Sequence, residues 1–355
     1  MVCRVSWKVI LVPRALLAFL AFAWPSQASA AEPPQDQSLV VDSGAGKTLT
    51  LSPTEFARLP RTTRRVKLPH SEAMATYEGV LLYRLLQEAG ACFEHPSSPQ
   101  TISRILPGAL RTSYVLIEAA DGYRVVFSVA EIHPDLGGKD VLLADRVDGQ
   151  PLGDRAAPFQ VIAAASQLYG RWIRQVTRVV IQPAAHRTGE PKAPATSEKS
   201  LLVVNEAGTT IRLTPAEFAK LPRTVIRDKV PPHEDVTASY EGVLLHELLQ
   251  KAGVKFDDRA AAEGEPRVPA ALRTAYVSIE AADGDQVVFS IPEVHPDLGG
   301  RRVLVADRVD GQPLAEDARP YRVIVAGSNL YEVWIGQVTA VCVRHATESV
   351  RTESE

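Results

Sequence analysis

Two short motifs in this chain carry the residue types of metal chemistry, and each occurs twice. A histidine and an aspartate stand two positions apart in the HPDLGG segments, at His133 and Asp135 and again at His295 and Asp297. Imidazole and carboxylate groups bind zinc, but a metal site needs three or four such ligands. The sequence shows no further ligand cluster. We therefore interpret both motifs as turns that the aspartate caps and the two glycines close.

Paired aspartates form a second candidate for chemistry, because two carboxylates can share general acid and base roles. They stand at Asp145 and Asp148 and again at Asp307 and Asp310. The second member of each pair precedes a glycine, which is typical of a tight hairpin turn. We interpret Asp148 and Asp310 as turn residues and Asp145 as a strand residue that pairs with the neighbours of Arg146. No phosphate-binding glycine motif and no nucleophile-elbow serine accompanies them.

These motifs recur because the chain repeats itself. Residues 107–152 match residues 269–314 at 35 of 46 positions without a gap, at an offset of 162. Upstream, residues 76–90 match residues 239–253 at 11 of 15 positions, at an offset of 163. A repeat of this length is domain-sized, and two units are too few for a solenoid. Each candidate site can therefore be compared with its own equivalent in the other half.

The repeat predicts two tandem domains. Copy 1 spans residues 39–183 and copy 2 spans residues 201–345. Residues 184–198 between them are rich in Pro, Ala and charged residues, which is typical of a linker. Each copy is large enough to form its own hydrophobic core.

The first 30 residues predict a secretory signal peptide. Three basic residues precede a short apolar run, and Ala28-Ser29-Ala30 forms a small-residue cleavage site. The apolar run is too short to span a bilayer as a helix. We expect an exported protein, periplasmic or extracellular, with no membrane span after cleavage.

The charge balance limits the class of partner, and the cysteine count limits the possible disulfides. Without the N-terminal segment the chain has 36 Lys+Arg and 42 Asp+Glu, so no nucleic-acid partner is expected, since such proteins present a basic face. A protein or small-molecule ligand is compatible with this composition. Cys3 lies in the predicted signal peptide. The two cysteines that follow it, Cys92 and Cys342, have no equivalents in the opposite copy, and two cysteines exclude a disulfide framework. One bridge between them or two separate buried thiols both remain open.

The local patterns predict an α+β domain in each copy. Ser52-Pro53-Thr54-Glu55 has the form of a helix capping box. Residues 80–89 place their apolar side chains on one helical face, and Gly90 ends that helix. Short alternating strands joined by tight turns follow. We expect a mixed or antiparallel sheet with short helices rather than a βαβ unit.

The order of these segments resembles the molybdopterin-binding domain of the sulfite oxidase family, in two tandem copies. The resemblance rests on YEGVLLYRLLQEAG, IEAADGYRVVFSVAEI, VLLADRVDGQPL and APFQVIAAASQLYGRWIRQVTRVVI, and on their counterparts in copy 2. It implies a molybdenum–pterin cofactor and oxidation or reduction of small oxygen-bearing substrates. The family's metal-binding cysteine would lie in residues 60–76 or 222–239. Neither interval contains a cysteine.

The resemblance also implies residues that would hold the pterin in copy 1. These are Arg171, Trp172 and Arg174 near the final motif, with His70 and Arg65 as a polar wall. Copy 2 has Val333 and Gly336 in place of the two arginines of the final motif. A phosphate-bearing ligand needs positive charge or helix N-termini, so copy 1 is the candidate for molybdopterin binding.

Three functions follow as hypotheses. The first is a non-redox binding or interaction module that has lost the molybdenum ligand, which the missing cysteine favours. The second is an active molybdenum-cofactor oxidoreductase that acts through copy 1 on a small oxyanion or a sulfoxide-like substrate. The third is a structural pseudo-dimer in which duplication replaces a homodimer.

Overall fold

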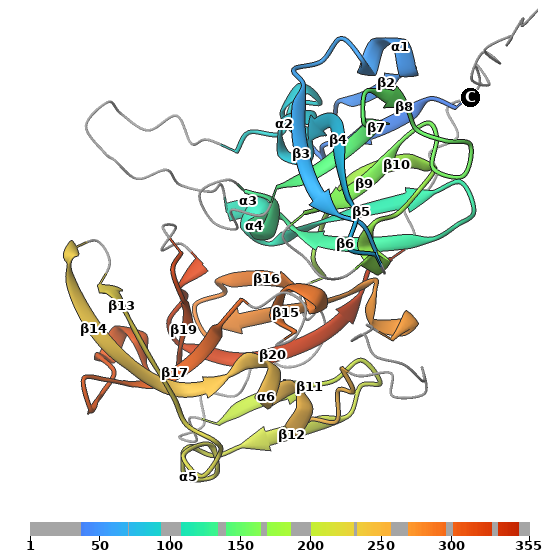
Figure 1. Cartoon of the computed structure of the whole chain (residues 1–355). Coiled ribbons are helices and arrows are strands. Elements are labelled where there is room, and N and C mark those ends of the chain that lie inside the picture. Colours follow the sequence, from blue (N-terminus) through green and yellow to red (C-terminus); the bar gives the residue numbers. More distant parts are fainter. Residues whose placement is uncertain are drawn as a thin grey trace, which may run out of the picture. The chain divides into compact units, whose positions relative to one another are not determined.

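The computed structural model describes residues 37–69, 71–93, 108–133, 140–164, 169–185, 200–230, 233–256, 269–295, 301–328 and 333–347 (Figure 1). The predicted signal peptide, most of the predicted linker and the end of the chain lie outside these residues. Both copies belong to one compact unit, which spans Gln35–Glu355.

Copy 1 contains ten strands and five short helices among the described residues. They are β1 (Leu39–Asp42), β2 (Thr48–Leu51), α1 (Pro53–Phe56), β3 (Thr62–Lys67), β4 (Met74–Leu81), α2 (Leu82–Glu88), α3 (Gly108–Arg111), β5 (Ser113–Ala119), β6 (Arg124–Ser128), α4 (Val129–Ile132), β7 (Val141–Val147), β8 (Gln150–Pro151), β9 (Gln160–Ala163), the 3₁₀ helix η1 (Tyr169–Arg171) and β10 (Val176–Pro183).

Copy 2 repeats this order. Its elements are β11 (Leu201–Val204), β12 (Thr210–Leu213), α5 (Pro215–Phe218), β13 (Thr224–Val230), β14 (His233–Leu244), α6 (Leu245–Lys251), η2 (Ala270–Leu272), β15 (Ala275–Ala281), β16 (Gln286–Ser290), α7 (Ile291–Val294), β17 (Val303–Val309), β18 (Gln312–Pro313), η3 (Glu316–Ala318), β19 (Arg322–Val325) and β20 (Val338–His345).

The strands form four five-stranded sheets, two in each copy. In copy 1, one sheet has the order β2-β1-β10-β5-β6, and the other has β3-β4-β7-β8 with β9 also paired to β7. All pairs are antiparallel except β1 with β10. In copy 2 the same orders recur, with β11 parallel to β20.

The predicted α+β fold class is wrong, because the described chain is mostly β. Its longest described helices, α2 and α6, have seven residues each. The segment from Tyr77 onward, expected as part of a helical motif, begins instead as strand β4. There it pairs with β3 on one side and β7 on the other. A short apolar run fits a strand as well as a helix, and only pairing with distant strands decides between them.

Several local predictions are confirmed. Ser52 and Glu55 form the capping box at α1, and Gly90 has a φ of 98° after α2. Asp148 has a φ of 49°, and its side chain accepts a hydrogen bond from the Thr76 backbone N–H at 2.8 Å. Asp148 therefore closes the β7–β8 turn and ties it to β4.

Gly79 lies where β4 crosses β7 too closely for any side chain. A Cβ at this position would lie 2.0 Å from the Leu143 carbonyl oxygen, and one at Gly242 would lie 2.1 Å from that of Val305. The register of β4 against β7 shifts between Glu78 and Gly79, as in a β-bulge. Glycine is thus required in both copies by backbone packing.

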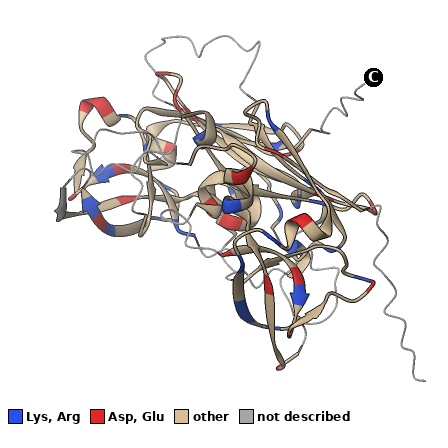
Figure 2. Cartoon of the chain, turned by 90° about the horizontal axis from the view of Figure 1, so that it is seen from above, with Lys and Arg blue, Asp and Glu red and all other residues tan. Residues whose placement is uncertain are grey.

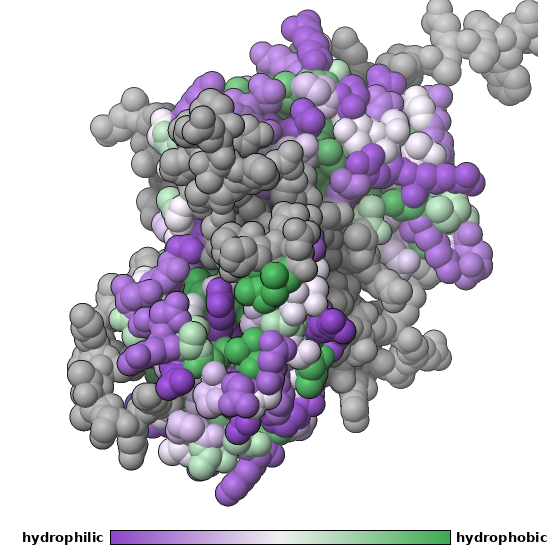
Figure 3. All heavy atoms as spheres, turned by 90° about the vertical axis from the view of Figure 1, so that its left-hand side faces the viewer, coloured by the Kyte–Doolittle hydropathy of each residue, from purple (hydrophilic) through white to green (hydrophobic). Residues whose placement is uncertain are grey.

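The outer surface is mixed in character. Lys and Arg residues are interspersed with Asp and Glu residues over the described elements (Figure 2), and polar residues predominate on the face seen in Figure 3. Among the described residues, the exposed large apolar ones are Met74, Val225 and Val236, and scattered residues of this kind are normal. Among the described residues, no helix is long and apolar enough to cross a membrane.

The two cysteines differ in burial and are not joined in a disulfide. Cys92 is exposed and Cys342 is buried. The expectation that both thiols are buried is therefore wrong for Cys92.

Candidate functional site

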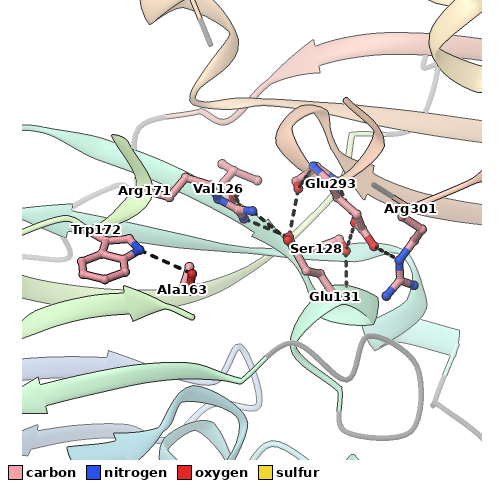
Figure 4. Close-up of polar contacts among 9 residues, drawn as sticks. Val126, Ser128, Glu131, Ala163, Arg171, Trp172, Glu293 and Arg301 are labelled. Carbon is pink, nitrogen blue, oxygen red and sulfur yellow. Dashed lines mark hydrogen bonds and ion pairs between the residues drawn. The ribbon is translucent and has the colours of Figure 1, made fainter. Parts of the chain in front are cut away.

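A buried polar cluster joins the two copies where α4 of copy 1 meets α7 of copy 2 (Figure 4). Each helix begins at a serine: the Ser128 hydroxyl accepts from the Glu131 N–H at 2.9 Å, and the Ser290 hydroxyl accepts from the Glu293 N–H at 3.2 Å. Each hydroxyl then donates to the glutamate of the other copy. Ser128 bonds Glu293 at 2.6 Å, and Ser290 bonds Glu131 at 3.0 Å.

This crossed pattern has the form of an isologous interface. In a symmetric dimer, residue i contacts residue j of the partner, and j contacts i in return. Here the two halves of one chain reproduce that relation. β6 and β16, the strands that lead into α4 and α7, lie side by side.

Arg171, predicted to hold a pterin, belongs to this cluster. Its two terminal nitrogens donate to the two carboxylate oxygens of Glu131 at 2.7 and 2.8 Å. One of them also bonds the Val126 carbonyl at 2.9 Å, and the guanidinium carbon lies 3.6 Å from the centroid of the Phe127 ring. Arg171 is 2% exposed and Glu131 is 1% exposed. This pair is therefore desolvated and bidentate.

Copy 2 neutralises its equivalent glutamate differently. Val333 stands where copy 1 has Arg171, and Glu293 pairs instead with Arg301, whose Nε lies 2.9 Å from Oε1. Arg301 precedes β17 and is far in sequence from the Trp334 segment. The position equivalent to Arg301 in copy 1 is Lys139, outside the described residues. The two glutamates thus occupy equivalent positions but receive arginines from different segments.

Around the cluster, equivalent residues of the two copies again contact each other or each other's partners. Tyr114 and its equivalent Tyr276 stack with ring centroids 4.6 Å apart and an interplanar angle of 25°. Arg111 forms an ion pair with Asp285. At the equivalent position, the Arg273 guanidinium lies 4.8 Å from the centroid of the Tyr123 ring. Burial of the two stacked tyrosines raises the pKa of both phenols.

The remaining predicted site residues do not converge on Arg171. Trp172 is buried and donates its indole N–H to the Ala163 carbonyl at 3.4 Å. Arg174 and Arg65 are exposed, and His70 lies outside the described residues. The arginines predicted to act together are therefore separated, one in the core and two at the surface.

A smaller group of basic and aromatic side chains surrounds Tyr77 in copy 1. Arg64 is the cross-strand partner of Tyr77, so both side chains lie on one face of the sheet. The Tyr77 ring packs edge-on against Trp172 with centroids 5.8 Å apart. Burial is the main cause that raises the pKa of Tyr77, and the nearby positive charge of Arg174 opposes this shift. Arg64 pairs with Asp140, Nε to Oδ2, at 2.6 Å. We call Arg64, Tyr77, Trp172 and Arg174 the Tyr77 face.

The equivalent face of copy 2 keeps the aromatic residues and loses the charges. Tyr240 packs edge-on against Trp334 at 5.5 Å, and Ile226 is the cross-strand partner of Tyr240. Gly336 stands where copy 1 has Arg174. The aromatic pair is therefore part of the common fold, and the arginines are particular to copy 1.

The histidines of the two HPDLGG motifs are buried. His133 is buried against Phe93 with ring centroids 5.9 Å apart, and His295 against Phe256 at 5.2 Å. Asp135 lies outside the described residues. Arg61 forms ion pairs with both Asp145 and Glu78. No group of three or more His, Cys, Asp or Glu side chains that could hold a metal occurs in the described part of the chain.

These residues do not fit a phosphate-bearing pterin. Both terminal nitrogens of Arg171 are engaged by Glu131, and an anion entering there would meet the negative charge of that glutamate. No cysteine occurs in residues 60–76 or 222–239, so the soft thiolate ligand of such a molybdenum centre is missing from both intervals. We therefore derive no reaction step that uses a molybdenum–pterin cofactor.

Comparisons with known proteins add little. No family model matches the chain, and no curated protein matches it. Among solved structures, it is similar to the sulfane dehydrogenase SoxCD from Paracoccus pantotrophus, with a TM-score of 0.32 and 14% identity over 89% of this chain and 79% of that one. A likeness this distant supports no assignment of fold or activity. The sequence-based expectation of two α+β domains of the sulfite oxidase type is corrected by the sheets described above, because the described chain is mostly β.

The sequence analysis missed the glutamates at the centre of the cluster. The available signal was the Ser-x-x-Glu spacing of Ser128 to Glu131 and of Ser290 to Glu293, which is the sequence pattern of a capping box; the complete box forms in copy 2, and in copy 1 only the serine side chain caps the helix. That signal identifies the helix starts. It does not show that each serine also bonds the opposite copy.

Proposed function

We propose that this chain is an exported, non-redox binding protein in which the two copies act as one fixed pair. The Arg171–Glu131 pair supports this proposal, because the basic group available for a cofactor phosphate instead stabilises the junction between the copies. Export is proposed from the N-terminal sequence. Copy 1 is the ligand-binding half and copy 2 is its structural partner.

The ligand proposed for the Tyr77 face is a small anion. The observation that carries this proposal is the difference between the copies: arginines flank the aromatic pair in copy 1, and Ile226 and Gly336 replace them in copy 2. Among the described residues, no hydrogen bond or ion pair engages the exposed Arg174 guanidinium. A guanidinium binds carboxylate, phosphate or sulfate through charge-assisted hydrogen bonds.

Metal and pterin analysis tests the non-redox part of the proposal. The full-length protein is made in a host that synthesises molybdenum cofactor, and its molybdenum and fluorescent pterin are measured per chain. We expect neither. Near-stoichiometric molybdenum would overturn this part and support an oxidoreductase that acts through copy 1.

Inorganic phosphate and sulfate are the probes for the anion site. A ligand at about 100 times its Kd stabilises a folded protein by about 2.7 kcal/mol, so unfolding is followed in increasing concentrations of each salt, with chloride as the control for ionic strength. We expect stabilisation that Arg174→Ala removes. Arg65→Ala is the matched control, because Arg65 is also an exposed arginine but lies on the opposite face of β3 from Arg64. Equal effects of both variants, or no effect of either salt, would refute the anion site.

A further inference from the structure

The 3₁₀ helix η1 of copy 1 is held by copy 2 at two points. At the first, the Tyr123 hydroxyl donates to the Gly170 carbonyl in η1 at 2.8 Å, and the guanidinium of Arg273 from copy 2 lies over the Tyr123 ring at 4.8 Å. A cation above an aromatic ring favours one ring position. Arg273 therefore restrains η1 through Tyr123.

The second point is the buried cluster. Arg171, the last residue of η1, bonds Glu131, and Glu131 accepts from the Ser290 hydroxyl of copy 2 at 3.0 Å. The backbone of Val126 also links Arg171 to Arg273 of copy 2. Its carbonyl accepts from Arg171 at 2.9 Å, and its N–H donates to the Arg273 carbonyl at 3.2 Å. Each route from copy 2 to η1 passes through one intervening residue.

The segment held in this way presents Trp172. The backbone N–H of Trp172 donates to the Tyr169 carbonyl at 3.0 Å. The Trp172 ring packs edge-on against the Tyr169 ring, with centroids 5.4 Å apart. Since Trp172 also packs against Tyr77, a shift of η1 changes the aromatic part of the Tyr77 face.

Copy 1 does not hold the corresponding segment of copy 2 in the same way. The residue equivalent to Tyr123 is Asp285, which forms an ion pair with Arg111. The residue equivalent to Arg171 is Val333, and the glutamate of copy 2 pairs with Arg301 instead. The contacts that hold η1 therefore have no counterpart of the same residue types in copy 2.

We infer that copy 2 is a positioning partner that fixes η1, and with it Trp172, through Arg273 and Ser290. The inference rests on these contacts and is independent of any ligand. It gives the duplication a role beyond stability, because copy 1 by itself lacks two of the groups that order its tryptophan segment.

The test uses the full-length protein labelled with 5-fluorotryptophan. The chain has four tryptophans, and Trp172→Phe and Trp334→Phe assign the two ¹⁹F resonances of interest. Arg273→Ala is expected to displace or broaden the Trp172 resonance and to leave that of Trp334 in place. Tyr123→Phe removes only the hydroxyl that bonds Gly170 and is expected to move the same resonance, which guards against a variant that fails to fold.

Arg111→Ala is the matched control, because Arg111 occupies the equivalent position and contacts the opposite copy through Asp285. It is expected to leave Trp172 unchanged. An unmoved Trp172 resonance in folded Arg273→Ala and Tyr123→Phe would overturn the inference, and so would an equal displacement by Arg111→Ala. Failure of the anion-binding test would not affect this result, since no ligand is present.

Discussion

Replacing Arg171 by valine tests what the buried cluster contributes, because valine is the residue that copy 2 has at this position. The substitution removes both arginine nitrogens from Glu131, at 2.7 and 2.8 Å. The Ser290 hydroxyl would still bond that carboxylate, at 3.0 Å (Figure 4). Copy 2 tolerates valine because Arg301 neutralises Glu293.

The expected cost follows from burial. A charge-assisted hydrogen bond contributes about 1.5–3 kcal/mol, and Arg171 donates two of them to Glu131. Breaking a buried ion pair by removing one partner costs about 3–5 kcal/mol, because it leaves the other charge uncompensated. The contact of Arg171 with the Phe127 ring is lost as well. We therefore expect Arg171→Val to lower the free energy of unfolding by about 3–5 kcal/mol.

Urea unfolding measures this loss, followed both by circular dichroism and by tryptophan fluorescence. Coincident transitions are required before a free energy is extracted. The control is Arg64→Ala, which breaks the partly exposed pair with Asp140, and exposed pairs contribute about 0–1 kcal/mol. The double variant Arg171→Val, Glu131→Gln removes the orphaned charge and keeps an acceptor for Ser290, so it is expected to recover most of the loss.

Two results would refute this reasoning. One is a cost for Arg171→Val no larger than that of Arg64→Ala, which would mean that Glu131 is solvated or otherwise neutralised. The other is a double variant as unstable as the single one, which would mean that the loss comes from packing rather than from an unpaired charge.

Two further predictions concern a buried tyrosine of copy 2 and the helix caps of both copies. The Tyr321 hydroxyl is buried without a hydrogen-bond partner among the described residues, and copy 1 has Phe159 at that position. Tyr321→Phe is therefore expected to stabilise the protein by about 1–3 kcal/mol in urea unfolding, and Phe159→Tyr to destabilise it; a loss of stability in Tyr321→Phe would contradict this. Hydrogen bonds from the Ser52 backbone and side chain lower the pKa of Glu55, and Glu217 is shifted in the same way. This contribution is present above the ordinary glutamate pKa of 4.5 and is lost as the pH falls below it, so Glu55→Gln, Glu217→Gln is expected to flatten the stability–pH curve in that range, and an unchanged curve would count against it.

Local signals in the sequence predicted those features that neighbouring residues decide. The capping box of Ser52 and Glu55 and the turn at Asp148 were found because each depends on a few adjacent residues. Strands β3 and β4 pair with each other and were missed, because β4 is fixed as a strand by its pairing with β7, which lies far along the chain. The steric need for Gly79, which arises from the crossing of β4 and β7, could not be seen for the same reason.

In the candidate site, too, the sequence shows what neighbouring residues decide and the structure shows what distant residues decide. The sequence identified Arg171 as distinctive, since copy 2 has valine there, but assigned it to a cofactor. The structure places it on Glu131, at a junction that no local pattern describes. The cysteine-free intervals were a sequence observation, and they still bear on the proposed function.

The sequence by itself determined that this chain is a duplication, that its copies differ at a few basic positions, and that its hairpin turns and helix caps recur in both halves. These properties depend on composition and on short spacing. Only the tertiary structure decided that the domains are mostly β, that Ser128 and Ser290 each bond the opposite copy, and that Arg171 is buried. The reason is physical: burial and long-range pairing depend on which distant segments meet, and two nearly identical halves can meet in ways that their shared sequence does not specify.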